Sequence, residues 1–571
     1  MRFRLLTTLI ALGPTVLAPI RAIGQTVAPA AALQARVDSI FAPYDNRTSP
    51  GCAVAVMRDG AIIYERGYGM ADLEHDIPNS PETIFDIGST AKQFAAMSIM
   101  LLERDGKLSL NDDVRRHIPE LPDYGDTVRI RHLLTHTSGV RDYIGLLTLG
   151  GARYDDVTTD DDALAAIVRQ KALNFTPGSR YLYSNSGFFL LSVIVKRASG
   201  MSLRDFARQR LFDPLGMTNT HYLSSYDSIV RNRAIGYSPR DEEAPTTSGF
   251  RADMPRWLQT GDGGVSTTVR ELARWDANFY RPMVGDSAMI AELQRAARLT
   301  SGKEITYALG LRVDKYRGVQ AVSHGGSWGG YRAELIRFPT RRFSVATLCN
   351  LGSSDPSALA RRVADVYLAD VLGPAPTVAA RADRTARPTT RSALRPSTPL
   401  TQLAGLYRNV QSGETIVVSV AGDTAFVVMS RPHALRFVGN NEFLFSESDD
   451  GARLTIQPAT RARARTLTWR EDGSTPEVFE GIDAAQPTPA ELSAMAGTYF
   501  SEELQALYTL AVVDGALELR GRNRPPTRLR PSVRNEFTSQ SGSVVLRFEK
   551  PDSTFTLGIG RVKGLRFERV K

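Results

Sequence analysis

The sequence predicts an α/β domain with an antiparallel sheet beside a helical block, followed by two small all-β domains. Strand-like apolar runs occur at both ends of residues 25–372, with a mostly helical middle between them. A stretch rich in Pro, Ala, Arg and Thr at 373–399 has no apolar period, which is typical of a linker. Beyond it, at 400–485 and 489–571, short alternating runs separated by turns predict strands. The strand-like runs at both ends of residues 25–372 imply one sheet assembled from both ends of that segment.

Residues 1–24 are typical of a signal peptide. Two arginines precede an apolar stretch at 5–20, and Ala22 and Gly24 provide the small side chains that a signal peptidase recognises. The apolar stretch is shorter than the ~20 residues that span a bilayer comfortably. We therefore expect a periplasmic or secreted protein with no stable membrane span after cleavage, and an uncleaved anchor is the alternative.

The first part of the α/β domain predicts a helix, a hairpin and a second helix. Residues 31–44 suggest an amphipathic helix. The runs Cys52–Arg58 and Ala61–Gly67 flank Asp59-Gly60, a dipeptide that predicts a hairpin because both central turn positions need a positive φ. A long helix is then expected from about Ser89 to Arg104.

The chain to about residue 300 is mostly helices and loops, and strands then return. The expected strands are Val319–Ser323, Tyr331–Phe338 and Phe343–Cys349. A helix over Ser357–Leu372 closes the domain.

An internal repeat marks the two β domains. Leu403–Tyr407 reads LAGLY, and Met495–Tyr499 reads MAGTY. Each is followed by alternating apolar residues and a turn, Gly422-Asp423 in the first copy and Asp514-Gly515 in the second. Two arrays of similar length predict two small barrels or sandwiches.

The charge pattern argues against a nucleic-acid partner. The formal net charge is +9, but the basic residues are scattered among acidic ones. A nucleic-acid-binding protein normally gathers them on one stripe or helix. We expect a solvated basic surface, and an anionic envelope polymer is the alternative partner.

Gly88–Lys92 holds a serine and a lysine three residues apart at the expected start of a helix. Ser89 and Lys92 would share one helix face, at the end that carries free backbone N–H groups and the positive end of the dipole. A serine hydroxyl needs a base, and a lysine can serve when burial or nearby positive charge lowers its pKa. By itself this spacing more often marks a capping serine beside an exposed lysine.

Two later segments provide the groups that such a pair requires. Tyr183-Ser184-Asn185 offers a phenol that can relay a proton from the serine to a leaving group, and an amide that can hold both Lys92 and a substrate carbonyl. His324-Gly325-Gly326-Ser327 follows a predicted strand, where glycines let a substrate backbone approach closely. A buried tyrosine and a structural histidine are the alternatives.

Three motifs together resemble, in order and spacing, those of class C β-lactamases and related penicillin-binding-protein-like serine hydrolases. They are Ser89-x-x-Lys92, Tyr183-x-Asn185 and His324-x-Gly326. The flanking segments 130–139, 214–217 and 263–267 agree. The resemblance covers about residues 31–372 and implies the β-lactamase/transpeptidase-like fold.

The resemblance also implies a mechanism. Ser89 would be acylated and the acyl-enzyme hydrolysed by water, with Lys92 and Tyr183 as the general base and acid. Backbone N–H groups of Ser89 and Ser327 would form the oxyanion hole. Asn185, His324 and Gly326 would contact the substrate, and no metal or cofactor is implied.

The third motif departs from serine β-lactamases, which usually carry Lys-Thr/Ser-Gly. The imidazole of His324 is largely neutral above its reference pKa of ~6.5, and Gly325 lacks the hydroxyl that would hold a β-lactam carboxylate. The resemblance therefore favours a peptidase or amidase for small D-amino-acid or envelope-derived peptides, with the domain layout of D-aminopeptidase. A carboxylesterase, a weak β-lactamase and a catalytically silent binding protein are the alternatives.

Cys52 and Cys349 are the only cysteines. Two buried free thiols are one interpretation. In the implied fold their strands can be antiparallel neighbours, so a cross-strand disulfide in an oxidising compartment is the other. The β domains have two candidate roles, capping the cleft or driving formation of a homo-oligomer.

Two further patterns suggest other chemistry and are weaker. Gly325–Gly329 fits the nucleophile elbow of α/β-hydrolases, but the elbow needs a helix directly after Ser327, and residues 331–335 predict a strand. His132 and His136 stand four apart, as zinc ligands on a helix do, but a leucine replaces the metalloprotease glutamate between them. We expect both histidines to be structural.

Overall fold

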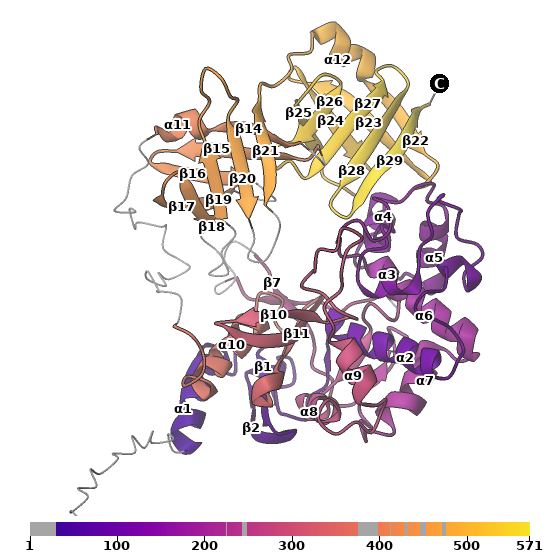
Figure 1. Cartoon of the computed structure of the whole chain (residues 1–571), viewed down its shortest axis with the longest axis vertical. Helices are drawn as coiled ribbons and strands as arrows, with labels where there is room; N and C mark the ends of the chain where they lie inside the picture. The colour runs from indigo at the N-terminus through magenta and orange to yellow at the C-terminus, as the bar shows by residue number, and fades with distance from the viewer. Residues whose placement is uncertain are drawn as a thin grey trace, which may run out of the picture.

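The computed structural model describes residues 30–223, 225–241, 248–257, 259–374, 398–410, 413–428, 432–445, 453–470 and 476–570. The predicted signal peptide and most of the predicted linker, 375–397, lie outside these residues. The described chain forms an α/β unit and two closed barrels, which lie side by side on one side of it (Figure 1).

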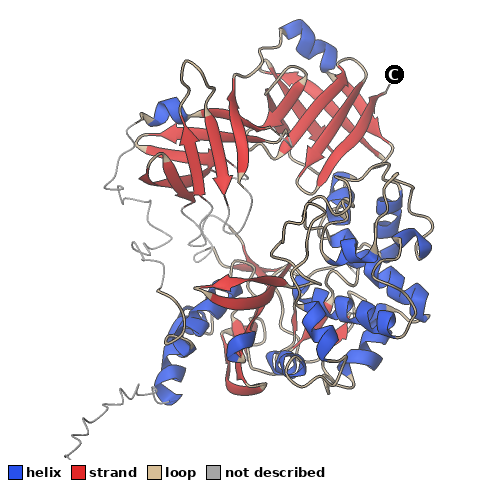
Figure 2. Cartoon of the chain, in the orientation of Figure 1, coloured by secondary structure: helices blue, strands red, loops and turns tan. Residues whose placement is uncertain are grey.

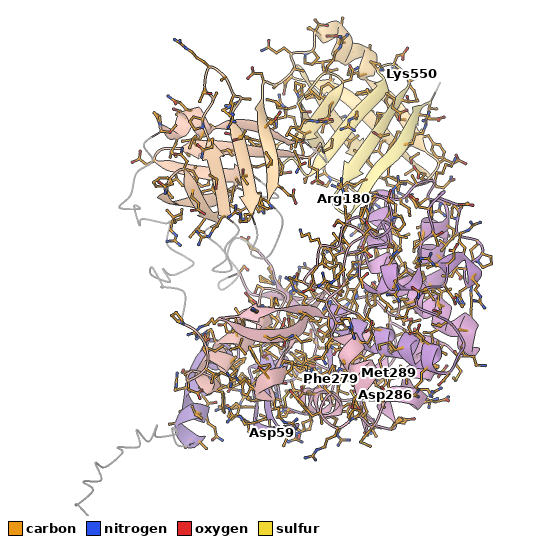
Figure 3. The ribbon with its side chains drawn as sticks, viewed as in Figure 1. Asp59, Arg180, Phe279, Asp286, Met289 and Lys550 are labelled. Carbon is orange, nitrogen blue, oxygen red and sulfur yellow. A yellow bond between two sulfur atoms is a disulfide. The ribbon has the colours of Figure 1, made fainter. Side chains whose placement is uncertain are left out.

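One antiparallel sheet is built from both ends of the α/β segment, as the sequence predicts. Its strand order is β10-β11-β12-β13-β1-β2. The strands are β1 Cys52–Arg58, β2 Ala61–Tyr68, β10 Arg312–Tyr316, β11 Val319–Trp328, β12 Tyr331–Phe338 and β13 Phe343–Cys349. Asp59 and Gly60 have φ of 55° and 78°, which confirms the predicted hairpin turn. Figure 3 shows Asp59 at the end of the molecule far from Lys550 of the second barrel.

The sheet separates two apolar cores. Along β1, Ala53 and Ala55 face the helical block, whereas Val54 and Val56 face the opposite side, as the two-residue period of a strand requires. The block comprises α2 Lys92–Arg104, α3 Ile130–Leu134, α4 Tyr143–Leu149, α5 Asp160–Val168, α6 Asn185–Ser199, α7 Leu203–Ala207, α8 Val269–Asn278 and α9 Ser287–Leu293. Helices α1 Ala30–Phe41 and α10 Pro356–Tyr367 cover the other face (Figure 2).

Short strands connect the sheet and the helical block. They are β3 Met70–Asp72, β4 Ile77–Pro78, β5 Phe85–Asp86, β6 His221–Tyr222, β7 Tyr237–Pro239, β8 Phe250–Ala252 and β9 Val265–Thr267. No described helix combines the length and the apolar character needed to cross a membrane.

Three element boundaries differ from the predictions. The helix expected from Ser89 opens with a 3₁₀ turn, η2 Gly88–Ala91, before α2 begins. The strand expected to end at Ser323 continues to Trp328, because its glycines still pair with β12. The last helix ends at Tyr367 rather than Leu372. Leu368 and Leu372 nevertheless stay buried in the same core, which explains why the apolar period continues beyond the helix.

The two β domains are closed barrels, which decides between the barrel and sandwich alternatives. The first barrel comprises β14 Gly405–Asn409, β15 Thr415–Ala421, β16 Thr424–Val428, β17 Pro432–Gly439, β18 Glu442–Phe445, β19 Arg453–Gln457, β20 Thr466–Arg470 and β21 Glu477–Ile482. The second comprises β22 Gly497–Ser501, β23 Ala506–Val513, β24 Ala516–Gly521, β25 Thr527–Pro531, β26 Glu536–Ser539, β27 Val544–Lys550, β28 Thr554–Ile559 and β29 Val562–Arg569. Short helices, α11 Leu400–Leu403 and α12 Pro489–Met495, precede them.

The repeated pentapeptide has one structural role in both barrels. Its tyrosine hydroxyl donates to the backbone carbonyl four residues upstream, at 2.6 Å for Tyr407 and 2.8 Å for Tyr499. An arginine from elsewhere in the same barrel lies over each ring, Arg465 in the first and Arg569 in the second. The repeat therefore fixes how a helix enters the first strand of each barrel.

The second barrel is docked firmly on the helical block. Leu146 and Leu149 of α4 and Ala166 of α5 are buried in the core of that barrel. Arg141 also donates to Glu503 at 2.5 Å, and both side chains are buried. A barrel attached in this way is held in a fixed position relative to the sheet and the helices.

Cys52 and Cys349 form a disulfide. They pair directly across β1 and β13, at opposite ends of the α/β segment. The interpretation as two free thiols is therefore wrong. The sequence predicts both runs as strands, and their pairing in the sheet brings the two sulfur atoms together.

Candidate active site

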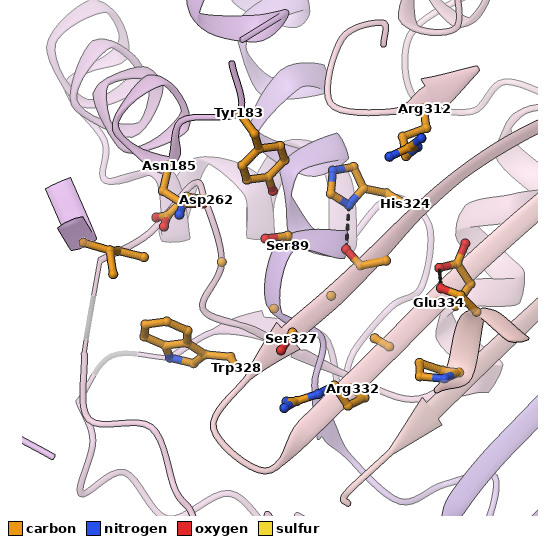
Figure 4. A pocket seen from close by; sticks show the side chains of 18 of the residues that line it. Ser89, Tyr183, Asn185, Asp262, Arg312, His324, Ser327, Trp328, Arg332 and Glu334 are labelled. Carbon is orange, nitrogen blue, oxygen red and sulfur yellow. Dashed lines mark hydrogen bonds between the residues drawn. The ribbon is translucent and has the colours of Figure 1, made fainter. Parts of the chain in front are cut away.

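A cavity of about 800 Å³ opens where β11 passes the start of α2 (Figure 4). It gathers nearly all of the residues that the sequence singled out. Those in its wall are Ser89, Tyr183, Asn185, His324, Gly326 and Ser327. Lys92 is fully buried and contacts Ser89 from within the fold.

The Lys92 amine has three oxygen atoms around it. Its Nζ lies 3.0 Å from Ser89 Oγ, 3.1 Å from Asn185 Oδ1 and 2.6 Å from the backbone carbonyl of Asp262. A neutral amine has two N–H groups and one lone pair. It can therefore donate to the amide and the carbonyl while accepting the proton of the serine hydroxyl. This coordination suits a general base for Ser89.

Burial sets the protonation of Lys92. Removal from water lowers its pKa well below the usual range, and the carboxylates of Asp262 and Asp142 oppose that shift by electrostatic attraction. The rings of Tyr183 and Phe188 lie 4.9 and 5.5 Å from Nζ. The amine can thus become neutral near physiological pH.

Tyr183 approaches Ser89 from the other side. Its hydroxyl is within hydrogen-bond reach of the serine and points toward it in Figure 4. Burial raises the pKa of this phenol, so it stays protonated at neutral pH and acts as a donor. The ring packs on His136, with 4.0 Å between centroids.

His324 belongs to a chain of hydrogen bonds that fixes its tautomer. The backbone N–H of Ser184 donates to His136 Nδ1 at 3.1 Å, so the proton of this neutral ring is on Nε2, 3.0 Å from the Tyr307 hydroxyl. Tyr307 then donates to His324 Nε2 at 2.8 Å. His324 therefore carries its proton on Nδ1, 2.7 Å from the carbonyl of Gly325.

Burial lowers the pKa of His324 to about 3, so the imidazole is neutral. Both of its ring nitrogens have protein partners. The ring thus offers the cavity no cation at the position where serine β-lactamases usually carry lysine.

Two glycines bring β11 against η2. A Cβ added to Gly326 would lie 1.8 Å from the carbonyl oxygen of Ile87, and one added to Gly88 would lie 2.7 Å from the nitrogen of Ser327. Gly326 is therefore needed for packing against Ile87 rather than for room beside a substrate. The close approach sets the backbone of Gly88, directly before Ser89, against that of Ser327. A two-donor oxyanion hole requires such a contact between the two segments.

Asp262 is a buried acid beside Lys92 that no motif in the sequence predicts. Asp262 accepts a hydrogen bond from the Tyr143 hydroxyl at 2.9 Å, and its carboxyl is buried. Burial raises the pKa of Asp262 and the positive charge of Lys92 lowers it. Its place directly before Gly263-Gly264, in a segment that carries the family resemblance, was the available clue.

A residue of the second barrel also lines the cavity. Arg561, in the turn between β28 and β29, lies over the ring of Tyr183, with Cζ 4.7 Å from the centroid. Its Nη1 is 3.7 Å from Asp142 Oδ2. No local pattern marks this arginine, because its role depends on how the barrel docks.

The weaker alternatives have structural explanations. Trp328 and a two-residue turn separate Ser327 from strand β12, so the helix that a nucleophile elbow needs is not there. His132 Nδ1 accepts a hydrogen bond from the backbone of Arg129, and His136 belongs to the chain described above. Both histidines therefore have structural partners.

Comparisons with known proteins agree with this geometry. A family model described as Beta-lactamase matches residues 33–369. A D-aminopeptidase of Gluconobacter oxydans (strain 621H) is 26% identical over 573 residues, 95% of this chain and 99% of that protein. Penicillin-binding protein 4* of Bacillus subtilis (strain 168) is 32% identical over 315 residues, 52% of this chain and 67% of that protein.

Two solved structures share the fold. The octameric penicillin-binding protein homologue from Pyrococcus abyssi has a TM-score of 0.54 and 23% identity, and the match covers 79% of this chain and 99% of that one. D-amino acid amidase from Ochrobactrum anthropi SV3 has a TM-score of 0.51 and 21% identity, and covers 60% and 98%.

Proposed function

Because the chain is a serine hydrolase of the beta-lactamase family, we propose that it cleaves amides of D-amino acids and small envelope-derived peptides through an acyl-Ser89 intermediate. The observation that carries this proposal is the position of the buried Lys92 amine. Its nitrogen lies 3.0 Å from Ser89 Oγ, and its N–H groups donate to Asn185 Oδ1 and to the carbonyl of Asp262. The similarity to a D-aminopeptidase over 95% of the chain supports the substrate class.

Acylation begins with neutral Lys92. As Ser89 Oγ attacks the amide carbon, its proton moves to Nζ, and the carbonyl oxygen gains negative charge beside the backbone N–H groups of Ser89 and Ser327. Tyr183 donates its proton to the leaving nitrogen and recovers one from Lys92. The C–N bond then breaks, the amine departs and the acyl group stays on Ser89 as an ester.

Deacylation uses the same groups in reverse. A water molecule attacks the ester carbon, and Lys92 with Tyr183 accepts its proton. The proton returns to Ser89 Oγ as the C–O bond breaks, which releases the acid. Each of these steps transfers a proton or an acyl group, and none changes an oxidation state.

We also propose that the protein acts in the periplasm or outside the cell. The Cys52–Cys349 disulfide supports this, because such bonds persist in oxidising compartments. Fractionation of the native host should recover the protein, processed before Gln25, outside the cytoplasm. Recovery of an unprocessed cytoplasmic protein with two alkylatable thiols would reject the proposal.

Three chromogenic substrates test the activity: a D-alanine anilide, a short-chain nitrophenyl ester and a cephalosporin. We expect anilide hydrolysis by the enzyme and none by Ser89→Ala, with an acyl adduct on Ser89 in quenched samples by mass spectrometry. Hydrolysis of the ester alone would make the protein a carboxylesterase. Preference for the cephalosporin would make it a β-lactamase, and no Ser89-dependent turnover would make it a binding protein.

A further inference from the structure

A buried glutamate lies in the cavity wall opposite the third motif. Glu334 of β12 pairs directly with Gly325 of β11. Its side chain is only 3% exposed, yet it lines the same cavity as Ser89 (Figure 4). The mechanism above uses neither the charge nor the hydrogen bonds of this carboxylate.

Glu334 occupies the space that a side chain at position 325 would need. A Cβ added to Gly325 would lie 2.9 Å from Glu334 Oε2. The glycine and the glutamate therefore depend on each other. Serine β-lactamases usually carry threonine or serine at the position of Gly325, where the hydroxyl holds a substrate carboxylate. In this chain the carboxyl group of Glu334 stands in that place.

The partners of Glu334 favour its charged form. Burial raises the pKa of this carboxyl, and the hydrogen bonds from Ser357 and Ser323 and the positive charges of Arg361 and Arg312 oppose that shift. Both of these hydrogen bonds come from neutral hydroxyls. A buried carboxylate held in this way is stabilised further by a cation that enters the cavity.

We propose that Glu334 determines specificity, by binding the free ammonium group of the substrate and excluding substrates that present a carboxylate at this position. This inference rests on the proposed function and narrows its substrate class to D-amino-acid amides and peptides with an unblocked amino group. It also gives a physical reason for glycine at 325. Arg312 and Arg361 are the competing groups, since they would favour an anion.

The direct test compares D-alanine nitroanilide with its N-acetyl derivative, by kcat/KM, in the enzyme and in Glu334→Gln. We expect the preference for the free amine to fall by about 10- to 100-fold in the variant, mainly through KM, because a charge-assisted hydrogen bond is lost. Glu292→Gln, the same change on α9, should keep the preference of the enzyme. An unchanged preference in Glu334→Gln, or a wild-type preference for the blocked substrate, would overturn the proposal.

A second measurement needs no variant at the glutamate. Two boronic acids that form adducts with Ser89, one bearing an ammonium and one a carboxylate at the same carbon, are compared as inhibitors of the native enzyme. We expect the ammonium compound to bind at least about tenfold more tightly. Tighter binding of the carboxylate compound would show that Arg312 and Arg361 govern the site.

A gain of function provides the reciprocal test. Glu334→Ala combined with Gly325→Thr makes room for a hydroxyl, and it should accelerate acylation of Ser89 by penicillin relative to Glu334→Ala alone. Equal rates would count against the proposal. Ser89-dependent hydrolysis of a neutral nitrophenyl ester reports on the acyl mechanism separately, so a failed specificity test is distinguishable from a failed function.

Discussion

Burial lowers the pKa of Lys92, and three oxygen atoms orient its amine. None of these oxygen atoms belongs to a residue adjacent to Lys92 in the sequence. Asn185 and the carbonyl of Asp262 take its two N–H groups, so that the lone pair is directed at Ser89. The Tyr183 hydroxyl lies within hydrogen-bond reach of the serine. In the proposed mechanism Lys92 accepts the serine proton and Tyr183 donates one to the leaving group.

Substitution of the proton donor should slow turnover without abolishing it. In Tyr183→Phe we expect kcat for the anilide to fall at least about tenfold, because the leaving nitrogen loses its acid. Tyr181→Phe, a nearby aromatic in the same cavity wall, is the control and should retain most activity. Steady-state kinetics measure both, and a Tyr183→Phe enzyme as fast as the parent would exclude the phenol from the mechanism.

The pH profile should reveal the charge of Asp262. Lys92 is active when neutral, so kcat/KM is lost as pH falls through its lowered pKa. The carboxylate of Asp262 raises that pKa, and Asp262→Asn should therefore move the acid limb to lower pH, by about one unit. Glu292→Gln should leave the limb in place. A shift toward higher pH would contradict this assignment.

At the scale of elements, the site is made where η2 meets β11. The 3₁₀ turn sets Ser89 at the start of α2, and the glycines of β11 permit contact between the two backbones. In the proposed mechanism the strand provides a hydrogen-bond donor and the helix provides the nucleophile. Neither element would suffice alone, because an oxyanion needs both at a fixed separation.

A methyl group on β11 should separate these elements. Gly326→Ala places a Cβ 1.8 Å from the Ile87 oxygen, so the strand must move. We expect about 1–3 kcal/mol of lost stability and a larger loss of kcat. Gly558→Ala in the second barrel meets no atom closer than Lys563 Cδ, at 3.5 Å, and should be tolerated. Thermal unfolding and anilide kinetics measure both effects, and normal activity in Gly326→Ala would show that the contact is dispensable.

At the scale of the whole molecule, the second barrel packs on the α/β unit and contributes to the cavity wall. It shares an apolar core with α4 and α5 and extends Arg561 over Tyr183. This arrangement supports the capping role among the two candidates that the sequence left open. The first barrel contacts the second through Arg408 and Glu536.

Substitution of Arg561, the barrel residue in the cavity wall, should reduce activity at neutral pH. Arg561 lowers the pKa of Lys92 and of Tyr183 by its positive charge. Arg561→Ala should therefore raise the pKa of the base, move the acid limb of kcat/KM to higher pH and reduce activity at pH 7 several-fold. Lys563→Ala removes a nearby cation that pairs with Glu414 and serves as the control. An unchanged pH profile of kcat/KM in Arg561→Ala would show that the barrel has no part in the mechanism.

Removal of residues 374–571 should leave a folded but less soluble α/β unit. The main core lies within that unit, but Leu146, Leu149 and Ala166 lose their cover. We expect native-like circular dichroism together with self-association on gel filtration, reduced by Leu146→Gln with Leu149→Gln. A fragment without cooperative unfolding would show that the barrels complete its core.

The sequence by itself determined most of the elements and the motif residues that meet at the cavity. The hairpin at Asp59-Gly60, the strands Tyr331–Phe338 and Phe343–Cys349, and the Ser89, Tyr183 and His324 motifs were all predictable, because turn chemistry and apolar period are local properties. The β-lactamase-related fold followed from the order of those motifs.

Only the tertiary structure decided the disulfide, the closure of the barrels, the acid behind Lys92 and the contacts of Glu334 and Arg561. Each depends on residues distant in sequence, such as Cys52 with Cys349 or Tyr183 with Arg561. Strand register and domain docking bring these groups together, and no local pattern encodes either one. The lowered pKa of Lys92 arises from burial in the assembled fold, because burial removes the water that would otherwise solvate the charged amine.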